Sequence, residues 1–226
     1  MDLFDYDPHG SLLCEGHPVR TLADRFGTPL YLYSAGTLRA HFERLRAAFA
    51  ELNPLICYSV KCCPNLQILR VLAACGSGFD VVSGGELYRA QAAGGDPALI
   101  VFAGVGKTEP EMEAALRARI GLLNVESGSE LEQLGGVARR LGVTAQVAVR
   151  ITPDVDPKTH AYTTTGTRET KFGVPMEHVP ELFRRHGREA GLNLRGLHLH
   201  IGSPVHDPQA YVVSIRRALV FVLGAS

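Results

Sequence analysis

Short apolar segments alternate with amphipathic segments along most of this chain, and this alternation constrains the fold more than any other feature. Six segments rich in Val, Ile and Leu are predicted to be strands: residues 55–60, 79–82, 99–102, 121–125, 145–151 and 194–201. Helical periodicity predicts helices at residues 66–74, 86–93, 109–118, 129–141, 178–186 and about 208–222. Repeated strand–helix units of this length predict an α/β fold with a parallel sheet and right-handed crossovers.

The helix boundaries carry their own sequence signals. Three pairs fit the capping box that starts a helix: Ser83 with Glu86, Thr108 with Glu111, and Ser127 with Glu130. Gly94, Gly95 and Gly142 stand where helices are expected to end.

Units of this kind could form an open doubly wound sheet or part of an eight-stranded (β/α)8 barrel of the TIM type. No G-x-G-x-x-G follows the first strand, so nothing favours the dinucleotide-binding variant of the open sheet. Barrels carry their chemistry at the C-terminal ends of their strands. Polar residues gather at those ends here: Lys61, Asp80, Arg150, His198 and His200. We therefore predict a partial barrel with about six strand–helix units, too few to close it.

Two segments fall outside this repeat. Residues 1–28 precede the first unit and are expected to form a separate leader. Residues 152–176 are expected to form a long polar loop, which in a compact domain is usually functional or mobile. The sequence ends soon after a helix that should lead into a seventh strand. We therefore expect either a fragment of a longer protein or an architecture that is not a closed barrel.

Composition excludes several classes of function. The 226 residues carry no net charge, which gives no electrostatic reason to expect nucleic acid or an anionic membrane surface as a partner. No apolar run is long enough to span a bilayer, and the N-terminus lacks a signal-peptide pattern. The five cysteines are odd in number and include no C-x-x-C pair, so a disulfide framework or a simple zinc site is a poor interpretation. We expect a soluble, cytoplasmic protein.

Lys61 follows the first apolar run and is expected to lie at the end of a buried strand. Burial of an ammonium is costly and favours the neutral amine, which is the form that attacks a carbonyl to make a Schiff base. The alternative interpretation is a lysine that only extends its charged end to water.

Four blocks around these residues resemble one enzyme family. They are Tyr-Ser-Val-Lys-Cys-Cys-Pro-Asn at 58–65, Gly-Ser-Gly-Phe-Asp-Val-Val-Ser-Gly-Gly-Glu-Leu at 76–87, Lys-Phe-Gly at 171–173 and His-Leu-His-Ile-Gly-Ser at 198–203. Together they resemble the pyridoxal-phosphate-dependent decarboxylases of the alanine-racemase-like barrel fold, which act on diaminopimelate, ornithine or arginine. The blocks occur in the family's order, and the likeness spans roughly residues 25–222.

The resemblance implies a site for pyridoxal 5′-phosphate, with Lys61 and His200 as catalytic residues. The implied roles are Lys61 for the Schiff base, Asp80 for an acid near that lysine, Arg150 for a cation near the phenolic oxygen, His200 for a ring against the pyridine, Gly202 for close backbone approach, and Ser203 for a hydroxyl on the phosphate. An electron sink of this kind stabilises the charge left when carbon dioxide departs.

Other interpretations of two of these positions stay open. Asp80 could be only a turn residue after a strand, and Arg150 could pair with Asp154 or Asp156 at the barrel end. Lys171 is expected to be an exposed loop cation.

His198 and His200 point to one face of a strand, as a metal pair would. Two imidazoles without an upstream cluster of Asp or Glu make an incomplete shell, so no metal is expected.

The resemblance further implies decarboxylation of the amino acid meso-diaminopimelate to L-lysine by a homodimer. It divides the chain into a leader, residues 1–28, that packs on a C-terminal β-domain, and an incomplete cofactor-binding barrel, residues 29–226. Because the β-domain is absent from these residues, we expect the chain alone to be inactive. The alternatives are a decarboxylase of ornithine, arginine or a polyamine precursor, a non-catalytic carrier of pyridoxal phosphate, and a truncated product without activity.

Overall fold

A parallel sheet forms the centre of the molecule. The computed structural model describes residues 2–152, 172–203, 205 and 207–224. Six strands pair side by side in chain order, and a short strand, β9, which lies between β8 and β10 in the sequence, pairs with β8 away from this path. The strands are β4 (Cys57–Ser59), β5 (Gly78–Val81), β6 (Ile100–Phe102), β7 (Leu122–Val125), β8 (Ala145–Thr152), β9 (Val174–Pro175) and β10 (Leu192–Leu199).

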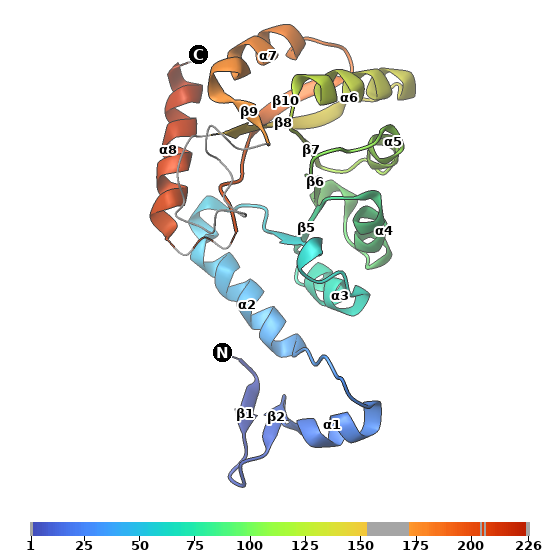
Figure 1. The fold of residues 1–226 in the computed structure, drawn as a ribbon, viewed down its shortest axis with the longest axis vertical. Coiled ribbons are helices and arrows are strands. Elements are labelled where there is room, and N and C mark those ends of the chain that lie inside the picture. Colours follow the sequence, from blue (N-terminus) through green and yellow to red (C-terminus); the bar gives the residue numbers. More distant parts are fainter. Residues whose placement is uncertain (1, 153–171, 204, 206, 225–226) are drawn as a thin grey trace.

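The strand order distinguishes between the two architectures that the sequence left open. A doubly wound sheet reverses its strand order at a switch point, whereas this sheet runs from β4 to β10 without a reversal. The sheet curves around an open centre, and α3 to α7 lie on its outer side (Figure 1). The predicted parallel barrel segment is therefore confirmed.

The helices alternate with the strands and lie close to the predicted ranges. They are α2 (Ala35–Ala48), α3 (Leu66–Ala74), α4 (Gly84–Ala92), α5 (Glu109–Arg117), α6 (Gly128–Leu141), α7 (Val179–His186) and α8 (Pro208–Gly224). Short 3-10 turns occur at Ala50–Leu52, Val60–Cys62, Pro97–Leu99 and Met176–His178. Sequence analysis did not predict α2, which packs against α3.

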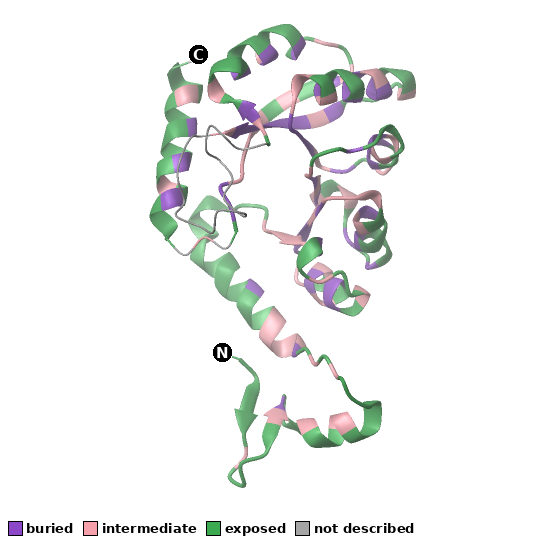
Figure 2. Ribbon diagram, in the orientation of Figure 1, coloured by how far each residue is buried: buried purple, intermediate pink, exposed green. Residues whose placement is uncertain are grey.

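The main core lies between the sheet and its outer helices. Successive side chains of a strand point to opposite faces, and the outward-pointing residues of the strands join the buried helix residues in one cluster. Phe79, Phe102 and Leu134 are fully buried there. In Figure 2 the buried colour accordingly follows the strands and the sheet-facing sides of the helices. The inward-pointing positions are then available to polar residues, and they include Asp80, Asn124 and Arg150.

Only one of the three predicted capping boxes is complete. Thr108 and Glu111 exchange both hydrogen bonds at the start of α5. At α4 and α6 the serine accepts the expected bond from the backbone of Glu86 or Glu130, but the glutamate side chain accepts from the residue before the serine. At α6 that residue is Glu126, which becomes important at the site.

The N-terminal residues form a small unit of their own. Strands β1 (Phe4–Tyr6), β2 (Leu12–Cys14) and β3 (His17–Pro18) pair antiparallel, and α1 (Val19–Phe26) follows them. The Glu15 carboxylate accepts hydrogen bonds from Ser34 Oγ and Gly36 N at the start of α2, at 2.6 and 2.7 Å. The position of this unit relative to a β-domain stays a prediction.

The predicted loop at residues 152–176 is partly wrong. Thr152 belongs to β8 and Val174–Pro175 form β9, because their backbones pair in parallel. Residues 153–171, with Asp154, Asp156 and Lys171, lie outside the described part of the chain. Among the described residues, no helix combines the length and the hydrophobicity that crossing a membrane requires.

Candidate active site

Lys61 lies at the C-terminal end of β4, but not in the setting that the sequence predicted. The strand ends at Ser59, and Lys61 sits in the 3-10 turn Val60–Cys62 with an exposed side chain. The prediction of a buried strand-end lysine was therefore wrong. A lysine in a turn can reach into the barrel mouth, and the charge of Lys61 does act on Asp80 and His200.

Asp80 points inward from β5, beside β4. Ser59 Oγ donates to Asp80 Oδ2 at 3.0 Å, and the two residues are register partners of adjacent strands. Burial raises the pKa of the Asp80 carboxyl, whereas the hydrogen bond from Ser59 and the positive charge of Lys61 oppose this rise. A carboxyl in such a setting exchanges a proton more readily near neutral pH than an exposed aspartate does.

Arg150 points inward from β8 and pairs with Glu126, at the end of β7. Arg150 Nη1 donates to both carboxylate oxygens of Glu126, at 2.8 and 3.0 Å, and both side chains are buried. The guanidinium also lies 5.6 Å from the centre of the Phe172 ring. The sequence allows an ion pair between Arg150 and Asp154 or Asp156, but these two aspartates lie outside the described residues. Among the described residues the partner is Glu126, which sequence analysis missed.

The two histidines lie next to this cation. His198 is the register partner of Arg150, and His200 directly follows β10. Burial is the main cause that lowers the pKa of His198 to about 3 and that of His200 to about 4, and the positive charges of Arg150 and Lys61 contribute to both values. Both imidazoles are therefore neutral at pH 7. His198 Nδ1 and Asn124 Oδ1 are buried and have no hydrogen-bond partner among the described residues.

Four of the six predicted site residues are linked by charge effects: Lys61 acts on Asp80, and both Lys61 and Arg150 act on His200. Gly202 and Ser203 follow His200 in the chain. Gly202 is buried with a φ of 124°, in the region that favours glycine, and Ser203 is exposed.

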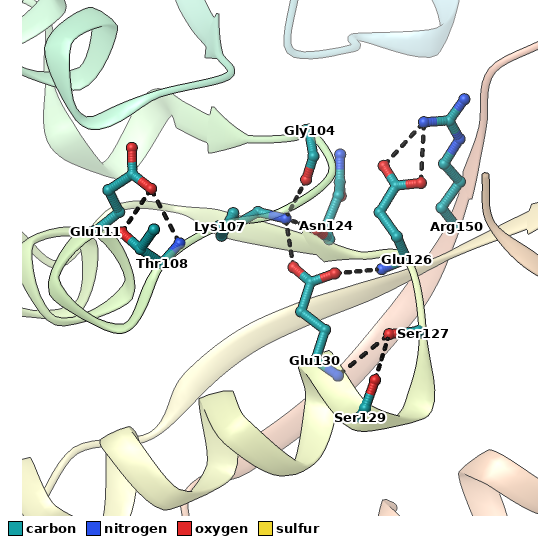
Figure 3. A network of polar contacts seen from close by, with 10 residues as sticks. All are labelled: Gly104, Lys107, Thr108, Glu111, Asn124, Glu126, Ser127, Ser129, Glu130 and Arg150. Atoms are coloured by element: carbon teal, nitrogen blue, oxygen red, sulfur yellow. Dashed lines mark hydrogen bonds and ion pairs between the residues drawn. The ribbon is translucent and has the colours of Figure 1, made fainter. Parts of the chain in front are cut away.

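A polar network beside Arg150 was also missed (Figure 3). Lys107 Nζ donates to the carbonyl oxygens of Gly104 and Asn124 and to Glu130 Oε1, and the other oxygen of Glu130 accepts from Glu126 N. The capping signal at α6 predicts only the start of a helix. Nothing local in the sequence marks Lys107. The network borders a cleft of about 400 Å³ that also reaches Phe172.

The sequence around this site matches a known protein family. A model described as "Pyridoxal-dependent decarboxylase, pyridoxal binding domain" matches residues 35–225. The chain belongs to this family. The resemblance noted from four sequence blocks is therefore confirmed.

Several similar proteins carry one name. Diaminopimelate decarboxylase of Neisseria meningitidis serogroup A is 47% identical over 212 residues, covering 94% of this chain and 52% of that protein. The Vibrio cholerae enzyme of the same name is 45% identical over 222 residues, covering 98% and 53%. The crystal structure of diaminopimelate decarboxylase from M. jannaschii with L-lysine matches with a TM-score of 0.91 at 35% identity, covering 99% of this chain and 53% of that chain. This chain therefore spans about half the length of the relatives it matches.

Proposed function

We propose that the protein decarboxylates meso-diaminopimelate to L-lysine, with pyridoxal 5′-phosphate bound covalently at Lys61. The observation that carries this proposal is the convergence of Lys61, Asp80, Arg150 and His200 at the strand ends of a pyridoxal-binding family domain. The names of relatives up to 47% identical favour diaminopimelate as the substrate. Because the chain spans about half their length, the complete reaction and a homodimer are proposed for the whole protein.

The interior of the sheet suits the cofactor chemically. Buried Asn124 Oδ1 and His198 Nδ1 offer polar atoms that have no partner in the described protein. A carboxyl, a guanidinium and neutral imidazoles supply both charges and an uncharged ring face. When bound, pyridoxal phosphate would supply the electron sink that decarboxylation requires.

Each proposed residue has a physical task. Lys61, in a turn at the mouth, would hold the cofactor covalently. Asp80, whose pKa is raised by burial, would exchange a proton with its neighbours. Arg150 would place fixed positive charge near the cofactor's phenolic oxygen. His200 would contact the pyridine ring without adding charge, since its pKa of about 4 keeps it neutral. Gly202 and Ser203 would approach the phosphate.

Covalent attachment is tested by reducing the protein with borohydride in the presence of pyridoxal phosphate and mapping the modified lysine by peptide mass spectrometry. The label is expected on Lys61. A visible absorbance band of bound cofactor is expected to disappear in both Lys61→Ala and Lys61→Arg, because arginine keeps the charge but cannot form the bond. A label on Lys107, or a band that survives Lys61→Arg, contradicts the proposal.

The substrate is tested by release of carbon dioxide from meso-diaminopimelate, ornithine and arginine in parallel. We expect lysine from meso-diaminopimelate and no product from the other two. Equal rates with all three would reject the substrate assignment while leaving the cofactor site intact.

A further inference from the structure

Lys107 forms a buried anchor point between two loops of the barrel mouth. Its side chain is 1% exposed, and its Nζ donates at 2.8 Å to Gly104 O, 2.6 Å to Asn124 O and 2.6 Å to Glu130 Oε1. An ammonium has three N–H donors, so all three are used. The Phe102 ring lies 5.8 Å away. The ammonium is therefore held in one place by strand β7, helix α6 and its own loop.

The Glu130 carboxylate connects Lys107 to the backbone of Glu126. One carboxylate oxygen accepts from Lys107, and the other accepts from Glu126 N at 2.9 Å. The Glu130 backbone N–H also donates to Ser127 Oγ. The main chain of Glu126 is thus fixed by a carboxylate that is itself fixed by a buried cation.

Glu126 in turn holds Arg150 through both of its carboxylate oxygens. Figure 3 shows the resulting continuous path from Lys107 through Glu130 and Glu126 to Arg150. This path runs along the barrel mouth, where the inward-pointing groups lie, rather than through the apolar core between sheet and helices.

Helix capping alone does not require this arrangement. At the start of α4, Glu86 makes the equivalent contact, accepting from Val82 N at 2.9 Å, and within the described residues it has no ion-pair partner. Burying the extra charges of Lys107 and Glu130 costs desolvation energy that an apolar pair of similar size would avoid. This desolvation cost indicates that the Lys107–Glu130 pair has a role beyond stabilising α6.

We infer that Lys107 and Glu130 are positioning residues that hold Arg150 in place through Glu126. This inference rests on the proposed function, in which Arg150 faces the cofactor's phenolic oxygen. Neither residue contacts the cofactor in this scheme. They fix the direction in which the Arg150 guanidinium points, as supporting hydrogen bonds generally fix charged groups in a site.

The deciding variant is Glu130→Gln. A carboxylate offers acceptors on two oxygens, whereas an amide offers one, so either Lys107 or Glu126 N must lose its partner. Lys107→Met removes the cation from the other side. The matched control is Glu132→Gln on the same helix, which breaks an exposed pair with Arg185.

Two quantities are measured on the purified protein and its variants. The first is the dissociation constant of pyridoxal phosphate, from its absorbance, which is expected to rise about tenfold in Glu130→Gln and Lys107→Met and to stay unchanged in Glu132→Gln. The second is the titration of His200, followed by NMR of labelled histidine without added cofactor. His200 feels the charge of Arg150, so it is expected to begin titrating at higher pH once Arg150 is released.

The outcomes separate the inference from the function on which it rests. If the parent protein shows no Lys61-dependent absorbance band, the proposed function fails. If the parent binds cofactor but Glu130→Gln matches Glu132→Gln in both measurements, only the inference fails. Circular dichroism checks the fold of each variant. An unfolded Glu130→Gln protein also counts against the inference, because the network would then serve the fold instead of Arg150.

Discussion

Ser59 and Asp80 face each other across two parallel strands, with 3.0 Å between Ser59 Oγ and Asp80 Oδ2. The hydroxyl donates to a carboxyl whose pKa is raised by burial, and its hydrogen bond opposes that rise. Ser59 lies just two residues before Lys61. The same short segment therefore carries the proposed cofactor lysine and adjusts the protonation of the acid beside it.

Ser59→Ala is expected to raise the pKa of Asp80 further, because a hydrogen bond that favours the charged carboxylate is removed. The pKa is measured by carbon NMR of the labelled Asp80 carboxyl. Ser214→Ala removes a hydroxyl elsewhere, which is buried and donates to Ala210 O in α8, and serves as the control. An unchanged or lower pKa in Ser59→Ala would show that the hydroxyl does not act on this carboxyl.

Most of the barrel segment could be predicted because most of its strands and helices carry a local signal. Runs such as 145–151 and 194–201 carry apolar residues at alternate positions over the length of a strand, and Gly142 ends α6 in the left-handed conformation that a C-cap glycine adopts. Helix α2 was missed because its polar and apolar residues do not separate clearly, and its stability depends on packing against α3.

The site was only partly predictable for a related reason. Lys61 and His200 lie in recognisable sequence blocks, but the exposed turn around Lys61 depends on where β4 stops pairing, and strand ends are set by the neighbouring strand. Glu126 and Lys107 are separated in sequence from the groups that they bind by 24 and 23 residues. Such contacts are created by the alignment of strands and loops, so a local reading cannot find them.

Glu126→Gln is expected to lower the free energy of unfolding by about 3 kcal/mol, because it leaves the buried Arg150 cation without its counter-charge. The measurement is urea denaturation at pH 7. Glu113→Gln, which breaks a surface pair with Arg117, is expected to change stability far less, since water screens that pair. Equal losses in the two variants would mean that the Arg150–Glu126 pair is no more important than a surface contact.

Stability is expected to fall on mild acidification because of the two histidines. The pKa of His198 is about 3 and that of His200 about 4 in the folded protein, against 6.5 ordinarily, so the unfolded chain binds more protons below pH 6.5. Their contribution is complete above pH 6.5 and is lost as the pH falls toward 4 and then 3. Each histidine adds a slope of up to about 1.4 kcal/mol per pH unit.

Denaturation at pH 7.0, 6.0 and 5.0 measures this slope in the parent and in His198→Gln. The variant is expected to have the shallower slope. The pKa of Asp80, which burial raises, acts in the opposite direction, and carboxyls with lowered pKa, such as Glu111 and Glu189, contribute only below their ordinary value of 4.5. If His198→Gln left the slope unchanged, groups other than His198 would cause the loss of stability in acid.

Two glycines are expected to respond to alanine in opposite ways. A Cβ on Gly121, just before β7, would overlap the Ala98 carbonyl oxygen, which belongs to the backbone and cannot move aside cheaply. Gly121→Ala should therefore destabilise the protein by about 1–3 kcal/mol. A Cβ on Gly136, inside α6, meets nothing within 4 Å, so Gly136→Ala should stabilise it by roughly 0.5–1 kcal/mol through helix propensity. Thermal unfolding followed by circular dichroism compares the two. If Gly121→Ala melted no lower than the parent, Gly121 would not lie as close to the carbonyl oxygen of Ala98, in the turn before β6, as the structure places it.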